Sequence, residues 1–410
     1  MAVVGVAVAF GSVIYLASKG VALWLSLLLG TGILGLLSQM GVEAFAGAVV
    51  SGLFDPMTVQ LVAAVALISG LSKAMKENGD LELMVRSLVS LVPRPKALSM
   101  LLPALIGMIN VPGGAVMSAP MVEENGRTLH TDAATQAAIN LVFRHIGYFI
   151  YPLHTSMILL SELLALPKLS IIKYNLLPTL FAVLVAYLFL FRSPASPHGL
   201  PQRQHSVGRH GRDFVRGFSS ILLILGLVLI FDLPFYLAAA AGLLLALLRN
   251  AGGEPRGAAL AVRLKRLVTV WIDYRLTLAI LFLMLFKAVV EASGVTGTLA
   301  AVLVNYDIPL PILIIVLGAL ASHILGAHLA ASGLLAPFFA PLIPQAALAP
   351  YAALLLIAIM LGYLVSPLHL CLVLTNQYFA VPYNQVVKKM AVPLLALLAA
   401  STVQLLFVLL

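Results

Sequence analysis

Long apolar runs separated by short polar segments follow one another along almost the whole chain. A helix needs about 20 apolar residues to cross a bilayer, and ten runs approach or exceed that length, five in each half. They are residues 2–18, 21–38, 57–76, 132–164, 170–191, 215–232, 234–248, 268–291, 349–380 and 384–410. The pattern predicts an all-α polytopic membrane protein with about ten transmembrane helices.

Two further apolar segments, residues 97–122 and 311–342, carry helix-breaking and polar residues at their centres. Proline removes a backbone donor and glycine weakens a helix, so the chain is expected to break there and turn back. Each segment is predicted to form a re-entrant helical hairpin. The residues at the expected tips are Asn110, Pro112, Gly113 and Gly114 in the first segment, and His323, Gly326, His328 and Ser332 in the second.

The span after each hairpin, residues 132–164 or 349–380, is too long for one straight crossing. Each span carries Gly-Tyr and then Pro near its middle, which predicts a broken helix. Non-helical backbone at membrane depth is tolerated only where protein or a watery cavity satisfies it. The two hairpin tips and the two helix breaks are therefore expected to converge on one site.

Two stretches of the chain are copies of each other. Gly147 to Pro178 aligns without a gap on Gly362 to Pro393, an offset of 215 positions, with ten of thirty-two residues identical. Duplication with broken helices is typical of secondary transporters. Five crossings per copy would place the copies in opposite orientations. The predicted division is a first inverted repeat at 1–191, a basic linker at 192–214 and a second repeat at 215–410.

A second match between the halves lies at nearly the same offset. The segment LSKAMKENG from Leu71 resembles LFKAVVEASG from Leu285. Both segments hold a Lys and a Glu four positions apart, a spacing that favours ion pairs along one helix face. The pairs Lys73/Glu77 and Lys287/Glu291 can therefore bond along their own helix faces, and a structural role is expected for both.

Composition agrees with a membrane protein and excludes a soluble globular one. Hydrophobic residues make up 62% of the 410 positions and charged residues 10%, against roughly 25% charged in soluble domains. The net charge of +9 comes from Lys and Arg gathered in the linker and between spans. That placement is typical of cytoplasmic loops and not of nucleic-acid binding. We expect a multi-pass protein of the cell membrane, partnered by lipid, with both termini outside and the linker 192–214 in the cytoplasm.

The residues that most often bind metals give little signal. The single cysteine, Cys371, excludes an internal disulfide and has apolar sequence neighbours, which favours packing. His323 and His328 are five positions apart, off the i, i+4 spacing of a helical metal pair. No metal site and no cofactor is predicted, and no enzyme motif such as H-E-x-x-H is present. A proton-coupling role for a histidine stays open.

Arg144 and His145 lie about a dozen residues into a span, just before the expected break. A cation at that depth costs roughly 2.5–3.5 kcal/mol, so it needs a partner or a function. Arg144 either binds a carboxylate or oxyanion, aided by helix N-termini, or it pairs with Asp132 or Glu162, or it reaches towards the cytoplasm. We expect Arg144 and His145 to bind the substrate.

Other polar and glycine residues complete the expected site. Further substrate contacts are assigned to Asn110, Gly113, Gly114, Ser118, His328, Ser332, Thr375 and Asn376. Bare backbone and amide or hydroxyl oxygens suit a hard cation. The candidates for a coupling ion are Asn110, Gly113, Gly147, Gly326, Gly362 and Ser366. For the hairpin glycines the alternative is tight helix packing, and for Thr375 and Asn376 it is hydrogen bonding between helices.

A hairpin followed by a broken helix, repeated once with inverted topology, resembles the ion transporter superfamily. That superfamily includes divalent anion/sodium symporters, citrate and gluconate permeases and sodium/proton antiporters. Within it, the chain is similar to a prokaryotic integral membrane family of unknown function. The resemblance implies an elevator-type carrier, a homodimer, whose hairpins and broken helices move together. The segments that carry the similarity are NVPGGAVMSAPMVEE from Asn110, FRHIGY from Phe143, FKAVVEASG from Phe286 and LVLTNQYF from Leu372.

The leading hypothesis is a secondary active transporter, a symporter that moves a small organic anion together with Na⁺ or H⁺. A cation/proton antiporter of the same superfamily is the alternative, and a channel is not excluded by composition. An antiporter usually needs a buried carboxylate as proton carrier. Within the two broken spans the candidate acid is Glu162, which lies near the outer end of the span 132–164.

Overall fold

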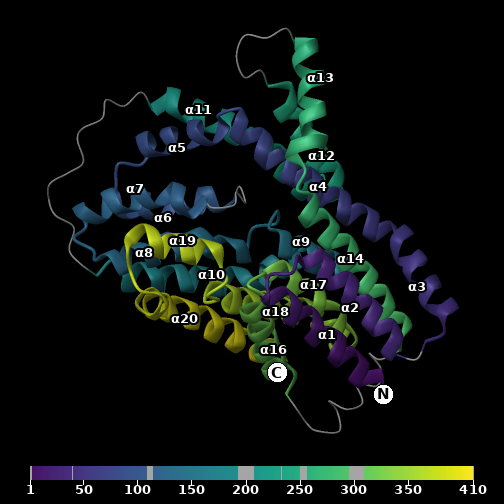
Figure 1. Cartoon of the computed structure of the whole chain (residues 1–410). Coiled ribbons are helices and arrows are strands. Elements are labelled where there is room, and N and C mark those ends of the chain that lie inside the picture. Colours follow the sequence, from purple (N-terminus) through teal and green to yellow (C-terminus); the bar gives the residue numbers. More distant parts are fainter. Residues whose placement is uncertain are drawn as a thin grey trace.

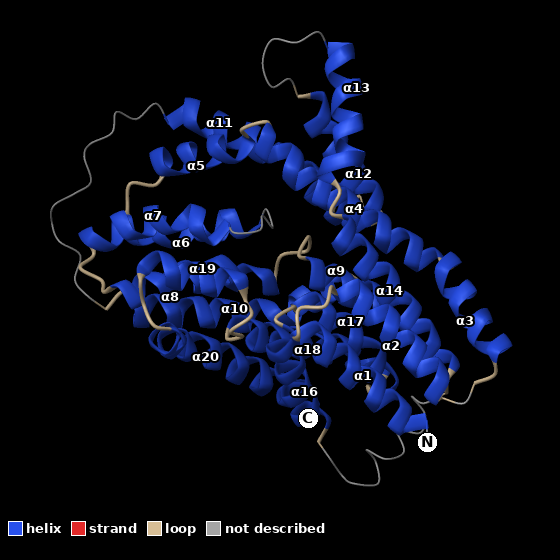
Figure 2. Cartoon of the chain, viewed as in Figure 1, coloured by secondary structure: helices blue, strands red, loops and turns tan. Residues whose placement is uncertain are grey.

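The computed structural model describes residues 2–38, 40–108, 114–192, 207–231, 233–249, 256–294 and 309–409. In these ranges the chain forms nineteen α-helices and four short 3-10 or π segments, with no β-strand (Figure 2). The predicted all-α fold is confirmed. Residues 109–113 and 193–206, which include the expected tip of the first hairpin and most of the linker, lie outside the described ranges.

The first half of the chain forms five leading helices, a helical hairpin and an interrupted helix. The hairpin arms pack against each other and lie where the sequence predicts a hairpin. The elements in order are α1 (Ala2–Ser18), α2 (Leu23–Leu37), α3 (Val42–Phe54), α4 (Pro56–Glu77), α5 (Asp80–Leu91), the arms α6 (Pro95–Met108) and α7 (Gly114–Thr128), the interrupted helix α8 (Ala133–Ile146), η1 (Gly147–Phe149) and α9 (Thr155–Leu163), and then α10 (Lys168–Leu190).

The second half repeats this order in its described residues. Its elements are α11 (Val207–Leu229), α12 (Phe235–Leu248), α13 (Arg256–Arg266), η2 (Leu267–Trp271), α14 (Tyr274–Ala292), the hairpin arms α16 (Leu310–Leu325) and α17 (His328–Phe339), η3 (Ala340–Leu342), η4 (Gln345–Ala347), the interrupted helix α18 (Leu348–Leu364) and α19 (Leu370–Phe379), and α20 (Tyr383–Leu409). Four pairs of equivalent helices, α6/α16, α8/α18, α9/α19 and α10/α20, each begin 215 positions apart. The short helices α3, α5 and α13 are not among the predicted elements.

Four helical segments are long and apolar enough to cross a membrane on their own: Pro56–Glu77, Lys168–Leu190, Gln345–Leu364 and Tyr383–Leu409. These segments differ in how much of their apolar surface is buried inside the protein. The apolar window of the segment containing α18 is 83% buried inside the protein, whereas that of α20 is 28% buried. Together with several shorter apolar helices, these lengths describe a multi-pass membrane protein, with α18 at its centre and α20 presenting an apolar face outward.

The hairpin of each half packs against helices of both halves. The first arm of each hairpin packs on the interrupted helix of its own half, α6 on α8 and α16 on α18. The second arm packs on its own half as well, α7 on α8 and α17 on α18, but also on the interrupted helix of the other half, α7 on α19 and α17 on α9. Figure 1 shows α6, α7, α8, α19 and α10 stacked on one side, and α1, α2, α3 and α14 on the other. The equivalent helices α10 and α20 also pack against each other.

One of the two predicted i, i+4 ion pairs is present. Lys287 lies 3.3 Å from Glu291 in α14, as predicted. Lys73 and Glu77 do not form the second pair, because residues 266–271 supply partners to both side chains. Lys73 Nζ donates to the Val270 carbonyl at 2.7 Å, and Glu77 accepts bonds at 2.8 Å from Arg266 and from the Trp271 indole. The end of α4 is therefore fastened to η2 instead of bonding along its own face.

Candidate functional site

Both interrupted helices break at a proline and restart at a histidine. Between η1 and α9 the chain passes Pro152, and His154 is the N-cap of α9. Between α18 and α19 it passes Pro367, and His369 is the N-cap of α19. Proline has no backbone donor and disfavours helix in the residue before it, so the helices end there. The breaks bring the amino ends of α9 and α19 into the interior.

Four histidines and two tyrosines from these breaks and from α17 form a closed ring of aromatic side chains. Successive ring centroids are 4.0–5.1 Å apart, from just below to within the range of roughly 4.5–7 Å that is usual for aromatic pairs. The tightest contacts join Tyr148 to His154 at 4.2 Å and Tyr363 to His369 at 4.0 Å, which are equivalent pairs in the two halves. In order around the ring the members are His145, Tyr148, His154, His328, Tyr363 and His369.

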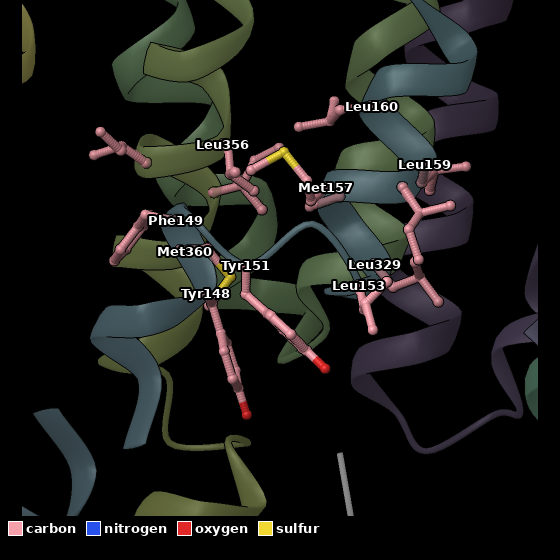
Figure 3. Packing of buried hydrophobic residues seen from close by; sticks show 14 of the residues in the cluster. Tyr148, Phe149, Tyr151, Leu153, Met157, Leu159, Leu160, Leu329, Leu356 and Met360 are labelled. Carbon is pink, nitrogen blue, oxygen red and sulfur yellow. The ribbon is translucent and has the colours of Figure 1, made fainter. Parts of the chain in front are cut away.

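The ring is held in place by hydrogen bonds and by an apolar layer behind it. The Tyr148 hydroxyl donates to the Gly107 carbonyl in α6 at 3.1 Å, and Ser156 Oγ lies 2.7 Å from His328 Nδ1. Figure 3 shows the hydroxyl ends of Tyr148 and Tyr151 pointing to one side, away from Met157 and Leu356. The Tyr148 hydroxyl of the ring therefore points away from this hydrocarbon packing.

A cavity of about 360 Å³ opens beside this ring. Its lining includes Arg144, His145 and His328, and also residues of α4 from Val65 onward. Near the end of α4, the exposed Lys73 also lines it. The cavity is therefore continuous from buried titratable side chains to a basic rim at the surface.

The amino ends of three helices line the same cavity. They belong to α9, α17 and α19, represented by Thr155, His328 and Cys371. In none of the three does a side chain cap the first turn. The first N–H groups of a helix have no partner within it, and they carry the positive end of the helix dipole. Three such ends directed at one cavity favour an anion there.

Arg144 lies between the two arms of the first hairpin and is 2% exposed. A Cβ atom on Gly107 would stand 2.3 Å from the Arg144 carbonyl oxygen, and one on Gly114 would stand 2.7 Å from Nη2 of its guanidinium. Both glycines are therefore needed for the hairpin to close on this residue. The two carboxylates that the sequence offered as partners for Arg144 pair with lysines instead, Asp132 with Lys389 and Glu162 with Lys168.

Comparison with known proteins places the chain in a family. A family model described as a protein of unknown function, DUF401, matches residues 5–409. The chain belongs to this family. The match agrees with the resemblance of the sequence to a membrane family of unknown function. No curated protein sequence matches the chain.

The fold of this DUF401 protein is similar to a solved structure. The YdaH transporter of Alcanivorax borkumensis, whose structure is described as revealing an unusual topology, matches with a TM-score of 0.59 at 16% sequence identity. The match covers 90% of this chain and 88% of that chain. At this identity the likeness shows a shared fold.

Two predicted site residues of the DUF401 protein, Ser118 and Thr375, lie in a buried polar network instead of on the cavity wall. Asn140, which the sequence analysis missed, accepts from Ser118 at 2.6 Å and donates to the Ala115 carbonyl at 2.9 Å and to Thr375 Oγ1 at 3.3 Å. The network joins α7, α8 and α19. Asn140 lies one helical turn before Arg144, a spacing that could have indicated it.

The remaining candidates fall into three groups. Gly326, His328, Arg144 and His145 line the cavity, and Gly114 touches the Arg144 guanidinium. Ser332 donates to the His328 carbonyl, Ser366 donates to the His323 carbonyl at 2.6 Å, and Gly362 packs tightly against the Ala319 backbone. Asn376 is half-buried in α19, and Gly147 begins η1 with open space around its Cα. Asn110 and Gly113 lie outside the described residues.

Proposed function

We propose that the protein is a secondary active transporter for a small organic anion, a carboxylate, coupled to Na⁺ or H⁺. The observation that carries the proposal is the meeting of Arg144 with three uncapped helix amino ends at one cavity. A guanidinium can bind a carboxylate through two parallel hydrogen bonds. The helix ends add fixed positive potential, worth roughly 0.3–1 kcal/mol each at exposed sites.

The charges around the cavity favour an anion over a cation. Besides Arg144, the ammonium groups of Lys73 and Lys76 belong to its lining. Asp273 is the one carboxylate among the described lining residues, and it accepts from the Leu276 backbone N–H at 3.1 Å as the N-cap of α14. The volume of about 360 Å³ lies at the small end of the range for ligand pockets, roughly 300–1,000 Å³, which suits a small acid.

The architecture supports transport by alternating access. The contacts exchanged between the halves are those expected of two inverted repeats, 1–191 and 215–410 joined by the linker 192–214. Hairpins and broken helices around a central site are typical of secondary transporters. The similar fold of a protein described as a transporter adds to this support. In the proposed elevator mechanism, the hairpins and interrupted helices carry the site across the membrane together.

A second cavity supports the same mechanism. It has a volume of about 590 Å³ and is lined by the earlier part of α4, including Gln60 and Ala64, and by the end of α9. Glu162 and Lys168, 3.0 Å apart, neutralise each other in its wall. Consecutive stretches of α4 thus line two cavities, of which only the one at Arg144 has an excess of positive side chains. We propose that these cavities are approaches from opposite sides of the membrane.

Placement and assembly are also part of the proposal. Lys73 and Lys76 lie at the end of α4 where basic side chains such as Arg249 and Arg266 gather, which favours the cytoplasm on that side. Both termini then lie outside. Elevator movement needs a stationary scaffold, for which we propose a homodimer. The alternative of a cation/proton antiporter is less well supported, since Glu162 is bound to Lys168 and Asp273 caps a helix.

The proposal is tested by ligand-induced thermal stabilisation of the purified protein. Acetate, succinate, citrate and gluconate are each added as sodium and as choline salts. A ligand at 100 times its Kd stabilises the folded state by about 2.7 kcal/mol, so a bound acid raises the unfolding temperature. A larger shift with sodium than with choline identifies sodium as the coupling ion.

Variants make the test specific to Arg144. We expect Arg144→Gln to lose the shift and Arg144→Lys to keep part of it, because lysine offers charge without the two-pronged geometry. Arg127→Gln, at a largely exposed arginine of α7, is the matched control and should respond like the wild type. An unchanged shift in Arg144→Gln would remove the anion site from this cavity.

A further inference from the structure

Three metal-binding side chains meet in the ring region. One nitrogen each of His145 and His369 and the sulfur of Cys371 all lie within 4.8 Å of one another. They come from α8 and from the start of α19, which are far apart in sequence. In tetrahedral zinc sites bonds of about 2.0 Å to nitrogen and 2.3 Å to sulfur put neighbouring ligand atoms about 3.5 Å apart. A movement of roughly 1 Å by these side chains would therefore close them on one ion.

Both imidazoles are oriented as metal ligands usually are. His145 Nδ1 lies 2.7 Å from the Leu141 carbonyl, and His369 Nδ1 lies 3.4 Å from the Leu364 carbonyl. A carbonyl only accepts hydrogen bonds, so Nδ1 carries the proton and Nε2 presents a lone pair. Metal-bound histidines commonly donate their other N–H to a backbone carbonyl in this way, which fixes the ring and its tautomer.

The Nε2 lone pair of His369 is buried, and the fold supplies no donor to it in the described residues. His369 is fully buried, and its Nε2 has no hydrogen-bond partner in the described part of the protein. A buried acceptor without a partner costs about 1–3 kcal/mol. His145 and Cys371 both line the cavity, and a ring nitrogen of His369 lies within 4.8 Å of their ligand atoms. A thiolate at Cys371 would also lie in the first turn of α19, whose dipole stabilises an anion.

We propose that His145, His369 and Cys371 bind a borderline-soft divalent transition metal ion, of which Zn²⁺ is the type. Two imidazoles and one thiolate match its ligand preference and leave the fourth position open towards the cavity. The thiolate offsets one of the two metal charges, which reduces repulsion with Arg144. The site goes beyond the proposed function and does not depend on it. If both hold, the open position can take a carboxylate oxygen of the anion.

The site exists in only one half of the chain. At the offset of 215 positions, His369 corresponds to His154, Cys371 to Ser156 and His145 to Met360. A hydroxyl and a thioether replace the thiolate and one imidazole, and Ser156 bonds to His328 instead. The first half therefore has the same backbone setting with poorer metal ligands, and no metal site is proposed there.

The test uses Co²⁺ as a spectroscopic probe of the purified, chelator-treated full chain in detergent, followed by Zn²⁺ competition. One Co²⁺ per chain should bind with a thiolate-to-cobalt absorption band, since Cys371 is the single cysteine. Cys371→Ser should abolish the band. His369→Gln should weaken affinity by more than the roughly 10- to 100-fold that loss of an outer partner costs. His130→Gln, at an exposed histidine outside the site, is the control and should bind as the wild type does.

Alkylation of the same cysteine gives a second readout that needs no variant. Mass spectrometry reports one maleimide per chain at Cys371, and bound Zn²⁺ should slow this reaction at least tenfold. Absence of the cobalt band in wild type, or equal alkylation rates with and without Zn²⁺, would overturn the proposal. Neither readout involves an organic anion, so failure here leaves the proposed transport function untouched, and the reverse also holds.

Discussion

At the scale of single residues, the chemistry of the site depends on which side chains the breaks bring together. Arg144 can be found from the sequence, because an arginine inside an apolar span is costly and so conspicuous. The contact of His145 with His369 cannot, because it depends on α8 packing against α19 across the two halves. Asn140 was missed for a similar reason, since its partners Ser118 and Thr375 lie on other helices.

Asn140 is predicted to contribute strongly to stability. Replacing it with Ala removes three buried hydrogen bonds, each worth about 0.5–1.5 kcal/mol net, and leaves Ser118 with its longer bond of 3.3 Å to the Ala115 carbonyl. The thermal unfolding midpoint should fall clearly. Thr375→Val, which removes only the 3.3 Å bond and keeps the side-chain shape, should lower it much less. Equal midpoints for Asn140→Ala and the wild type would show that the network does not hold α7, α8 and α19 together.

Gly114 is predicted to position the guanidinium. In Gly114→Ala the new methyl meets Nη2 at 2.7 Å and Nη1 at 3.0 Å, atoms at the end of a flexible side chain, so Arg144 moves and the fold survives. We expect anion affinity to fall about tenfold or more, as misplacement by about 1 Å can cost that much. In Gly107→Ala the methyl meets backbone at 2.3 Å, so stability should fall instead. Gly32→Ala, where a methyl meets open space, is the control and should bind the anion as the wild type does. Loss of anion affinity in Gly32→Ala would contradict a specific role for Gly114 in positioning Arg144.

At the scale of elements, the hairpins and interrupted helices follow from local sequence, whereas the short helices do not. Pro367 and Gly326 mark helix ends directly, and Gly326 adopts a φ of +59° between α16 and α17. The helices α3, α5 and α13 have 13, 12 and 11 residues. Such lengths are too short to cross a bilayer, so a search for spans passes over them.

The elevator proposal predicts that α7 moves relative to α3. Spin labels at Glu43→Cys and Arg127→Cys, both exposed, are introduced in a Cys371→Ser background. Pulsed electron paramagnetic resonance should give two populations of distances, with the anion shifting their ratio. A Glu43/Arg275 pair within the contacting helices α3 and α14 should give one unchanged distance. A single, ligand-independent distance for the first pair as well would argue against a moving hairpin.

At the scale of the whole molecule, the offset of 215 positions predicted which helices would correspond. It did not reveal that each hairpin packs its second arm on the interrupted helix of the other half. That arrangement is long-range and follows from shape complementarity, which no local pattern records. It is also what places helix ends from both halves around one cavity, so the site is a property of the complete chain.

Opposite orientation of the two halves is testable by labelling from one side. Glu43→Cys and Arg212→Cys, both exposed, are made in the Cys371→Ser background. A membrane-impermeant maleimide applied to intact cells should react with the cysteine at 43 at once and with that at 212 only after permeabilisation. Reaction of both from the outside would contradict the predicted topology, in which the linker 192–214 is cytoplasmic.

The central claim is that Arg144 and the amino ends of α9, α17 and α19 bind the transported anion. The most direct test is uptake of the radiolabelled acid identified by thermal stabilisation, into proteoliposomes under an imposed sodium or proton gradient. Wild-type protein should accumulate the acid above its external concentration, and Arg144→Gln should show less than about a tenth of that rate while Arg127→Gln matches the wild type. Gradient-driven accumulation by Arg144→Gln at the wild-type rate would contradict the account.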